Sequence, residues 1–156
     1  MALVHEQLYR SDDFAHVNLR QYVSVLTADL SRSYSLPGVQ VELRQRVEDL
    51  DIDVDIAISC GLIINELLTN IYKHAFVGRE HGLIEVEFYR NEQGHNTLVI
   101  RDDGVGLPAD SDLPQTKSLG ILIVNTLVKQ LHGELRLNRE GGTEYTIDFT
   151  RGATPV

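Results

Sequence analysis

The sequence is poor in cysteine, in long apolar runs and in clustered positive charge, and each absence excludes a class of protein. Cys60 is the single cysteine, so the chain can form neither a disulfide framework nor a thiolate zinc site. It lies in an apolar run and is predicted to be a small core residue. No apolar stretch is expected to reach membrane-spanning length, and no signal peptide is visible. These absences predict a cytoplasmic location, whether a parent protein is soluble or membrane-anchored.

The charge is acidic overall, and no basic run offsets it. Lys and Arg number 14 against 23 for Asp and Glu, which gives a formal net charge of -9. This balance disfavours non-specific binding to nucleic acid or anionic membranes, so we expect neither nucleic-acid binding nor direct membrane contact. A local cationic pocket for one phosphate ligand remains compatible with it. The 156 residues, 42% of them hydrophobic, suffice for one domain with a real core.

The order of the predicted elements indicates a two-layer α+β fold. We find no internal repeat, low-complexity tract or interdomain linker. Apolar periodicity predicts four helices, at residues 2–9, 18–32, 61–76 and 118–131. Alternating patterns predict five strands, at residues 39–43, 83–89, 97–101, 134–138 and 143–149. We therefore expect helices to cover one face of a mixed, mostly antiparallel sheet.

The most informative stretch is the predicted helix GLIINELLTNIYKHAF, residues 61–76. Glu66, Asn70, Lys73 and His74 interrupt its apolar pattern at i, i+4, i+7 and i+8, which places them on one helix face. An acid, an amide, a cation and an imidazole in line suit a charged ligand and a metal ion. The spacing alone is equally compatible with a stripe that faces water. Apolar residues around the rest of the helix favour burial, where a charge needs another protein group or a ligand as its partner.

Three further stretches have features of a nucleotide site, and each is weak alone. In IRDDGVGLP, residues 100–108, Asp102 ends a strand and precedes a glycine loop. Such a carboxylate can accept a hydrogen bond from an amine such as that of adenine, although Asp-Gly and Leu-Pro are also common in plain turns. Lys117, Ser118 and Gly120 stand at a helix start, which suits an anion, but a serine cap without a ligand is more frequent. Gly142-Thr143 is by itself a turn that opens a strand.

In chain order, the four stretches resemble the N, G1, G2 and terminal Gly-Thr boxes of the GHKL ATP-binding superfamily. The matching motifs are NELLTNIYKHAF, DDGVGLP, SLGILIV and GGTEYTIDF, and the resemblance covers residues 50–150. It is closest to the catalytic, ATP-binding domain of bacterial sensor histidine kinases, in the short-lid branch near the HWE kinases. The Trp-x-Glu element of that group is absent. The resemblance implies the Bergerat fold, with ATP and Mg²⁺ as ligands.

The resemblance assigns a role to each matching residue. Asn70 corresponds to the asparagine whose amide oxygen helps to hold Mg²⁺, and Glu66 to the acid that orients a metal-bound water or assists proton transfer. These two are the predicted catalytic residues. Asp102 corresponds to the aspartate that accepts from the adenine amino group. The other predicted ATP-binding residues are Lys73, His74, Gly104, Gly106, Lys117, Ser118, Leu119, Gly120 and Thr143.

Residues 1–10 resemble the end of the second dimerisation helix of that branch, so we expect residues 11–156 to form the ATP-binding domain. The resemblance implies transfer of the γ-phosphoryl group of ATP to a histidine on an upstream dimerisation domain, with a response regulator downstream in a two-component system. No histidine here has the sequence context of that acceptor, and we predict surface or structural roles for His5, His16, His81, His95 and His132. Two alternatives stay open: a stand-alone anti-sigma factor serine kinase of the same superfamily, and a nucleotide-sensing pseudokinase.

Overall fold

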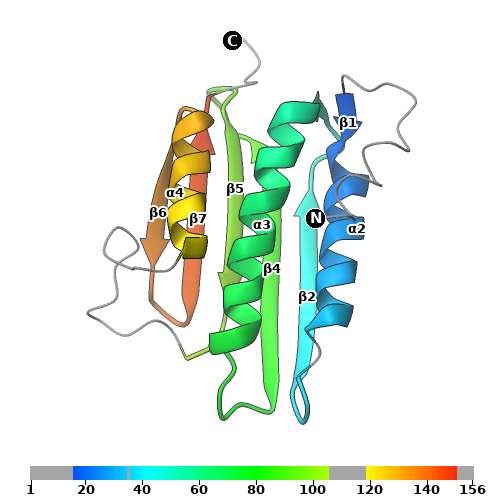
Figure 1. The fold of residues 1–156 in the computed structure, drawn as a ribbon, viewed down its shortest axis with the longest axis vertical. Coiled ribbons are helices and arrows are strands. Elements are labelled where there is room, and N and C mark those ends of the chain that lie inside the picture. The colour runs from blue at the N-terminus through cyan, green and yellow to red at the C-terminus, as the bar shows by residue number, and fades with distance from the viewer. Residues whose placement is uncertain (1–15, 35, 106–118, 151–156) are drawn as a thin grey trace.

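A computed structural model describes residues 16–34, 36–105 and 119–150, and arranges them in two layers (Figure 1). The helix predicted at residues 2–9 and most of the predicted loop after Asp102 lie outside the described residues. The described elements, in chain order, are β1 (His16–Asn18), α2 (Leu19–Ser33), β2 (Gln40–Val47), β3 (Asp51–Asp53), α3 (Val54–His74), β4 (His81–Arg90), β5 (Asn96–Asp102), α4 (Leu119–Gln130), β6 (Gly133–Asn138) and β7 (Thr143–Phe149).

The main sheet has five strands in the order β2-β4-β5-β7-β6. β2 runs parallel to β4, and every other neighbouring pair is antiparallel. Figure 1 shows α2, α3 and α4 side by side on one face of this sheet. The predicted fold class, a two-layer α+β sandwich with a mixed, mostly antiparallel sheet, is therefore confirmed.

The hydrophobic core lies between the sheet and the helices. Along β4, Ile84, Val86 and Phe88 are buried, and the residues between them are partly exposed, as the period of two in a strand requires. The ring of Phe88 meets that of Phe149 in β7 edge to face, with centroids 6.0 Å apart. The central helix α3 contributes the largest set of buried helical residues: Ile56, Ala57, Ser59, Cys60, Gly61, Ile63, Ile64, Leu67, Leu68, Ile71 and Tyr72.

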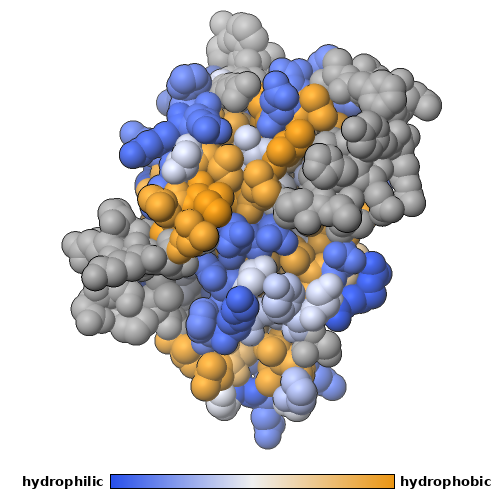
Figure 2. Space-filling view, viewed as in Figure 1, coloured by the Kyte–Doolittle hydropathy of each residue, from blue (hydrophilic) through white to orange (hydrophobic). Residues whose placement is uncertain are grey.

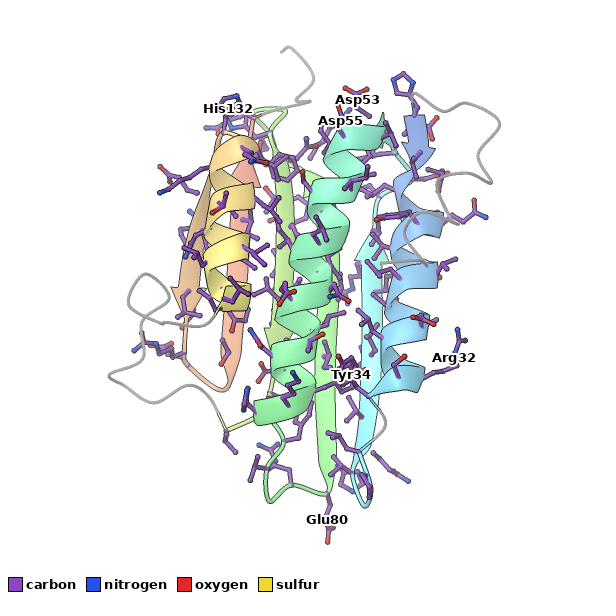
Figure 3. The ribbon with its side chains drawn as sticks, viewed as in Figure 1. Arg32, Tyr34, Asp53, Asp55, Glu80 and His132 are labelled. Atoms are coloured by element: carbon purple, nitrogen blue, oxygen red, sulfur yellow. The ribbon has the colours of Figure 1, made fainter. Side chains whose placement is uncertain are left out.

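α2 packs against the side of α3 that carries Gly61 and Tyr72. A Cβ atom at Gly61 would lie 2.1 Å from the hydroxyl of Tyr22, so a larger residue there would push this ring out of the interface. Tyr34 stacks on Tyr72 with centroids 6.1 Å apart, and Figure 3 shows it pointing toward α3. Cys60 is buried as predicted, and burial raises the pKa of its thiol to about 12. These contacts fix the rotation of α3 about its own axis.

The opposite face of the sheet carries charged side chains. Arg101, on the central strand β5, lies 3.6 Å from Glu85, 3.5 Å from Glu87 and 3.0 Å from Glu144. Desolvation lowers the pKa of Arg101, but the three carboxylates outweigh it and the pKa is raised. The guanidinium therefore ties β4, β5 and β7 together on the side away from the helices.

Two short strands were not predicted. β1 pairs antiparallel with β3, with His16 opposite Asp53, and this ribbon leads into the N-terminal end of α3. Asn18 caps α2 as predicted, since its side-chain oxygen accepts from the backbone N–H of Gln21 at 2.9 Å. α3 begins at Val54, seven residues before the predicted start, because the ribbon delivers the chain directly into the helix.

α3 also corrects the expectation that no apolar stretch reaches membrane-spanning length. Its 21 residues include a window of mean hydropathy 1.5, which is long and apolar enough to cross a membrane by length and composition alone. Inside the protein, 61% of that window is buried. The core helix of a globular domain meets the same criteria, and the position of α3 against the sheet accounts for its composition.

Candidate functional site

Three segments that are distant in the sequence meet toward the lower half of Figure 1. They are the C-terminal ends of α3 and β5 and the N-terminal end of β7. Asp102, at the end of β5, is the register partner of Thr143, at the start of β7. The backbone N–H of Val105 donates to the carbonyl of Ala75, directly after α3, at 2.8 Å. The predicted N-box, G1 and Gly-Thr stretches are therefore brought together.

Asp102 is a carboxylate held inside the protein by backbone groups. Its side chain is almost buried, with 7% of the residue exposed. The backbone N–H of Gly104 donates to its Oδ1 at 2.8 Å, and the backbone N–H of Thr143 also donates to the carboxylate. Burial raises the pKa of Asp102 and these two hydrogen bonds oppose it, with a net rise. Asp102 is therefore a hydrogen-bond acceptor in a fixed orientation, and burial disfavours its ionised form.

Two glycines allow the backbone to close around this carboxylate. A Cβ atom at Gly104 would lie 2.2 Å from the carbonyl oxygen of Ala75. Gly142 has a φ of +130°, and a Cβ atom there would lie 2.0 Å from the carbonyl oxygen of Asp102. Any side chain at either position would force the backbone apart. The close approach of three backbone segments at Asp102 thus depends on glycine at both places.

The predicted polar strip on α3 lies on the side of that helix away from α2. Asn70 is nine residues after Gly61, which corresponds to about 180° around the helix axis. Glu66 and Asn70 are partly exposed, and Lys73 and His74 in the last turn are exposed. α4 packs against α3. Because α2 covers the opposite side of α3, the strip lies on the side away from α2, and its four polar residues are partly exposed or exposed.

The start of α4 is only partly within the described residues. Gly120 lies in its first turn, where backbone N–H groups lack partners within the helix. Leu119 and Leu122 are 70% and 61% exposed, and Figure 2 shows apolar side chains over α4 on this face. The predicted site residues that lie outside the described residues are Gly106, Lys117 and Ser118.

The donor groups on α3 suit a metal ion that arrives with a ligand. Within the described ranges, no group of three or more His, Cys, Asp or Glu side chains is placed to hold a metal ion. One amide oxygen from Asn70 and one carboxylate from Glu66 match the way Mg²⁺ is bound in nucleotide sites, with phosphate oxygens and retained waters completing the shell. The residues therefore fit a phosphate-bound Mg²⁺ better than a site made of protein ligands alone.

The four described histidines other than His74 stand apart from this end of the molecule or on the surface. His16, His81 and His132 are exposed, and His95 is partly exposed. Figure 3 shows His132 beyond the far end of α4, where its φ of 56° ends the helix. Their predicted surface or structural roles fit these positions.

Two side chains next to Asp102 were not singled out from the sequence. Arg79, between α3 and β4, donates from Nη1 to the backbone carbonyl of Asp103 at 3.0 Å. Asp103 accepts at Oδ1 from the backbone N–H of Leu83 at 2.8 Å. In the sequence, the two consecutive acids Asp102 and Asp103 indicate that a positively charged side chain should lie nearby. The sequence does not show which of the 14 Lys and Arg residues this is.

Comparison with known proteins places this arrangement in a family. Residues 55–152 match the family described as histidine kinase-, DNA gyrase B- and HSP90-like ATPases. Residues 1–34 match a second family, described as histidine kinase. The chain belongs to the histidine kinase-, DNA gyrase B- and HSP90-like ATPase family, and the predicted recognition as a histidine kinase catalytic domain is confirmed. The predicted boundary after residue 10 stays a prediction.

Individual relatives agree with this assignment. The chain is 34% identical to Blue-light-activated histidine kinase 2 of Erythrobacter litoralis over 110 residues, 70% of this chain and 32% of that protein. It is 33% identical to the sensor histidine kinase PdtaS of Mycolicibacterium smegmatis over 153 residues, 94% of this chain and 30% of that protein. The chain thus spans about a third of the length of these curated relatives.

A solved structure shows the same fold. The histidine kinase domain of the Erythrobacter litoralis EL346 blue-light activated histidine kinase superposes with a TM-score of 0.82 at 26% identity. The superposition covers 96% of this chain and 70% of that one. The predicted Bergerat fold is therefore confirmed.

Proposed function

We propose that this domain binds Mg·ATP and donates the γ-phosphoryl group to a histidine on an upstream dimerisation domain of the same parent protein. The reaction would serve two-component signal transduction in the cytoplasm, with a response regulator downstream. The observation that carries the proposal is Asp102: a buried carboxylate, braced by two backbone N–H groups, opposite Thr143 and beside the end of the polar strip of α3.

Each part of the nucleotide has residues of suitable chemistry. Asp102 would accept from the adenine amino group, and Thr143 and the backbone at Gly104 would line the base. Asn70 and Glu66 would hold Mg²⁺ and its water, and the ion, when bound, neutralises phosphate charge. The remaining residues proposed to contact the phosphates, ribose or lid side of the nucleotide are Lys73, His74, Gly106, Lys117, Ser118, Leu119 and Gly120. Catalysis by this chain would consist mainly of positioning and charge stabilisation.

Two other functions use the same site differently. An anti-sigma factor kinase would transfer to a partner's serine, and a pseudokinase would bind nucleotide without transfer. The match of residues 1–34 to a histidine kinase family favours a histidine acceptor. The presence of Glu66, Asn70 and Asp102 together favours transfer over sensing.

Calorimetry with Mg·ATP tests binding. The wild-type chain should bind, and Asp102→Asn should weaken binding about 10- to 100-fold, because a hydrogen bond to a charged acceptor contributes about 1.5–3 kcal/mol. Asp29→Asn is the matched control, since Asp29 lies on α2, where it pairs with Arg32 at 3.6 Å, and it should bind as the wild type does. No binding by the wild-type chain would refute the proposal.

A transfer assay with the dimerisation domain supplied separately tests the acceptor. The expected product is an acid-labile phosphohistidine on that domain. Phosphoserine on a partner protein would favour the anti-sigma factor kinase. Tight Mg·ATP binding without any transfer would favour the pseudokinase.

A further inference from the structure

Arg79 lies outside the four nucleotide motifs, yet it grips the loop that follows Asp102. Its Nη1 donates to the carbonyl oxygen of Asp103 at 3.0 Å, and its Nη2 lies 3.9 Å from Oδ2 of the same residue. The turn that carries Arg79 is itself tied to the end of α3, because the backbone N–H of Arg79 donates to the carbonyl of Phe76 at 3.1 Å. Arg79 therefore connects the end of α3 to the loop after β5.

The hydrogen bond from Arg79 fixes the peptide unit between Asp103 and Gly104. The carbonyl of Asp103 and the N–H of Gly104 belong to the same planar peptide group and point in opposite directions. Arg79 holds the carbonyl end of this group, and its N–H end donates to Oδ1 of Asp102 at 2.8 Å. Rotation of the peptide would break both hydrogen bonds together. Holding the oxygen thus keeps the N–H aimed at the carboxylate.

Asp103 has a second attachment, on the β4 side. Its Oδ1 accepts from the backbone N–H of Leu83 at 2.8 Å, and its own N–H donates to the carbonyl of Leu83 at 3.2 Å. With Arg79, these bonds hold Asp103 by its backbone N–H, its carbonyl and its carboxylate. The residue between Asp102 and Gly104 has little freedom to turn while Arg79 remains in place.

Arg79 also balances charge at this point. Three groups interact with Asp102 through their charge or titration: Asp103 in its own loop, Arg79 from the α3–β4 connection, and Tyr145 in β7. After burial, which is the main cause, Asp103 also raises the pKa of Asp102, whereas Arg79 lowers it. Without Arg79, the negative charge of Asp103 would stand uncompensated beside the carboxylate of Asp102, whose pKa burial already raises.

We propose that Arg79 is a positioning residue for purine selection, which holds the peptide that orients Asp102 so that this carboxylate accepts from the 6-amino group of adenine. The proposal rests on the proposed function. Inosine triphosphate differs from ATP by a carbonyl oxygen in place of that amino group and by a hydrogen on N1. An ionised Asp102 in a fixed orientation repels this oxygen. The hydrogen bond from Arg79 to the carbonyl of Asp103 should therefore increase the preference for ATP over inosine triphosphate.

The test compares the dissociation constants of Mg·ATP and Mg·inosine triphosphate for the wild-type chain and for Arg79→Gln. The variant should bind ATP about tenfold more weakly and inosine triphosphate as tightly as before or more tightly, because the fixed carboxylate attracts the amino group and repels the carbonyl oxygen. Arg44→Gln is the matched control, since Arg44 is an exposed arginine that pairs with Glu42 on the same strand at 3.1 Å. It should leave both constants unchanged.

A compensating change separates charge balance from general damage. Adding Asp103→Asn to Arg79→Gln removes the unbalanced charge and keeps a side-chain oxygen for the N–H of Leu83. Part of the preference for ATP should therefore return. Arg79→Lys keeps the positive charge and one donor, so its preference should stay within about threefold of the wild type. If Arg79→Gln does not fold, the double variant Arg79→Gln/Asp103→Asn serves as the test, and its preference for ATP should be weaker than that of Arg79→Lys.

Equal weakening of both nucleotides in the folded variants would mean a merely structural role and would overturn the proposal. So would a preference for ATP that survives Arg79→Gln unchanged. If the wild-type chain binds neither nucleotide, the proposed function and this inference both fail. If the wild type discriminates and Arg79→Gln discriminates equally well, the inference alone fails.

Discussion

At the scale of single residues, Asp102 shows a conflict between binding and stability. Burial raises its pKa above the ordinary value of 3.8. The folded chain therefore binds this proton more tightly than the unfolded chain does. The free energy of unfolding therefore falls as the pH rises from the pKa of Asp102 in the unfolded chain to its pKa in the folded chain. Above the folded pKa, ionisation of the buried carboxylate destabilises the fold by the full amount. Below the ordinary pKa of 3.8, Asp102 is protonated in both states and this destabilisation disappears.

The first prediction concerns this pH dependence. Asp102→Asn carries no charge at any pH, so its unfolding free energy relative to wild type should be more favourable at pH 7 than at about pH 4. Urea unfolding of both proteins across this range measures the difference. Asp29→Asn, at a partly exposed site on α2, provides the control. A difference that stays constant, or that grows in the variant's favour toward low pH, would contradict the assignment.

The second prediction concerns the close backbone contact at Gly142. Gly142→Ala should lower the unfolding free energy by about 2 kcal/mol or more, because its Cβ atom would meet the carbonyl oxygen of Asp102. Gly141→Ala is the neighbouring control: it also has a positive φ, +69°, but no atom lies within 4 Å of the added Cβ. Only backbone strain of about 1 kcal/mol is expected there. Chemical denaturation of the two variants gives the comparison, and equal losses would refute the contact.

At the scale of elements, the sequence predicted what local pattern determines. β7 was predicted with its observed ends, Thr143–Phe149, because apolar and polar residues alternate cleanly between a Gly-Gly turn and the end of the sheet. β1 and β3 were missed because each has three residues, too few to show a period, and they form only by pairing with each other. The same limit applies to Arg79, whose contact with Asp103 spans 24 residues of sequence.

The third prediction concerns the start of α2. Asn18→Ala should lower the unfolding free energy by about 1–2 kcal/mol. The side chain of Asn18 accepts from the N–H of Gln21 and donates to Asp49 at 2.7 Å, so both bonds are lost. Gln21→Ala, at an exposed position on the same helix, should change stability by less than about 0.5 kcal/mol. Thermal unfolding of both variants measures the difference, and a loss for Asn18→Ala no larger than the control's would refute the cap.

At the scale of the whole molecule, the proposed nucleotide site depends on how segments dock, not on any one element. α3 is fixed by α2 on one side, and its end reaches the loop after β5 through Ala75 and Val105. The strands that carry Asp102 and Thr143 are held in register by their neighbours. A ligand that spans these segments should therefore stabilise the whole fold.

The fourth prediction follows from this linkage. At a free concentration of 100 times its Kd, Mg·ATP should raise the unfolding free energy by about 2.7 kcal/mol, which corresponds to a rise in Tm of roughly 5–10 °C for a chain of this size. Removal of Mg²⁺ with a chelator should reduce the rise. Asn70→Ala should make the remaining rise insensitive to the chelator. A full rise in Tm without Mg²⁺ in the wild type would refute the metal role of Asn70 and Glu66.

Arg101 and Asp102 are consecutive residues with different tasks on opposite faces of one strand. Arg101 joins three carboxylates on the outer face, and Asp102 faces inward toward the helices. Substitutions on the outer face of β5 can therefore accumulate without reaching the face that carries Asp102. Deletion of one residue within this strand would exchange the two faces, turning the guanidinium inward and the carboxylate outward. Natural variation in β5 should thus consist of replacements, with changes in length confined to the turns at its ends.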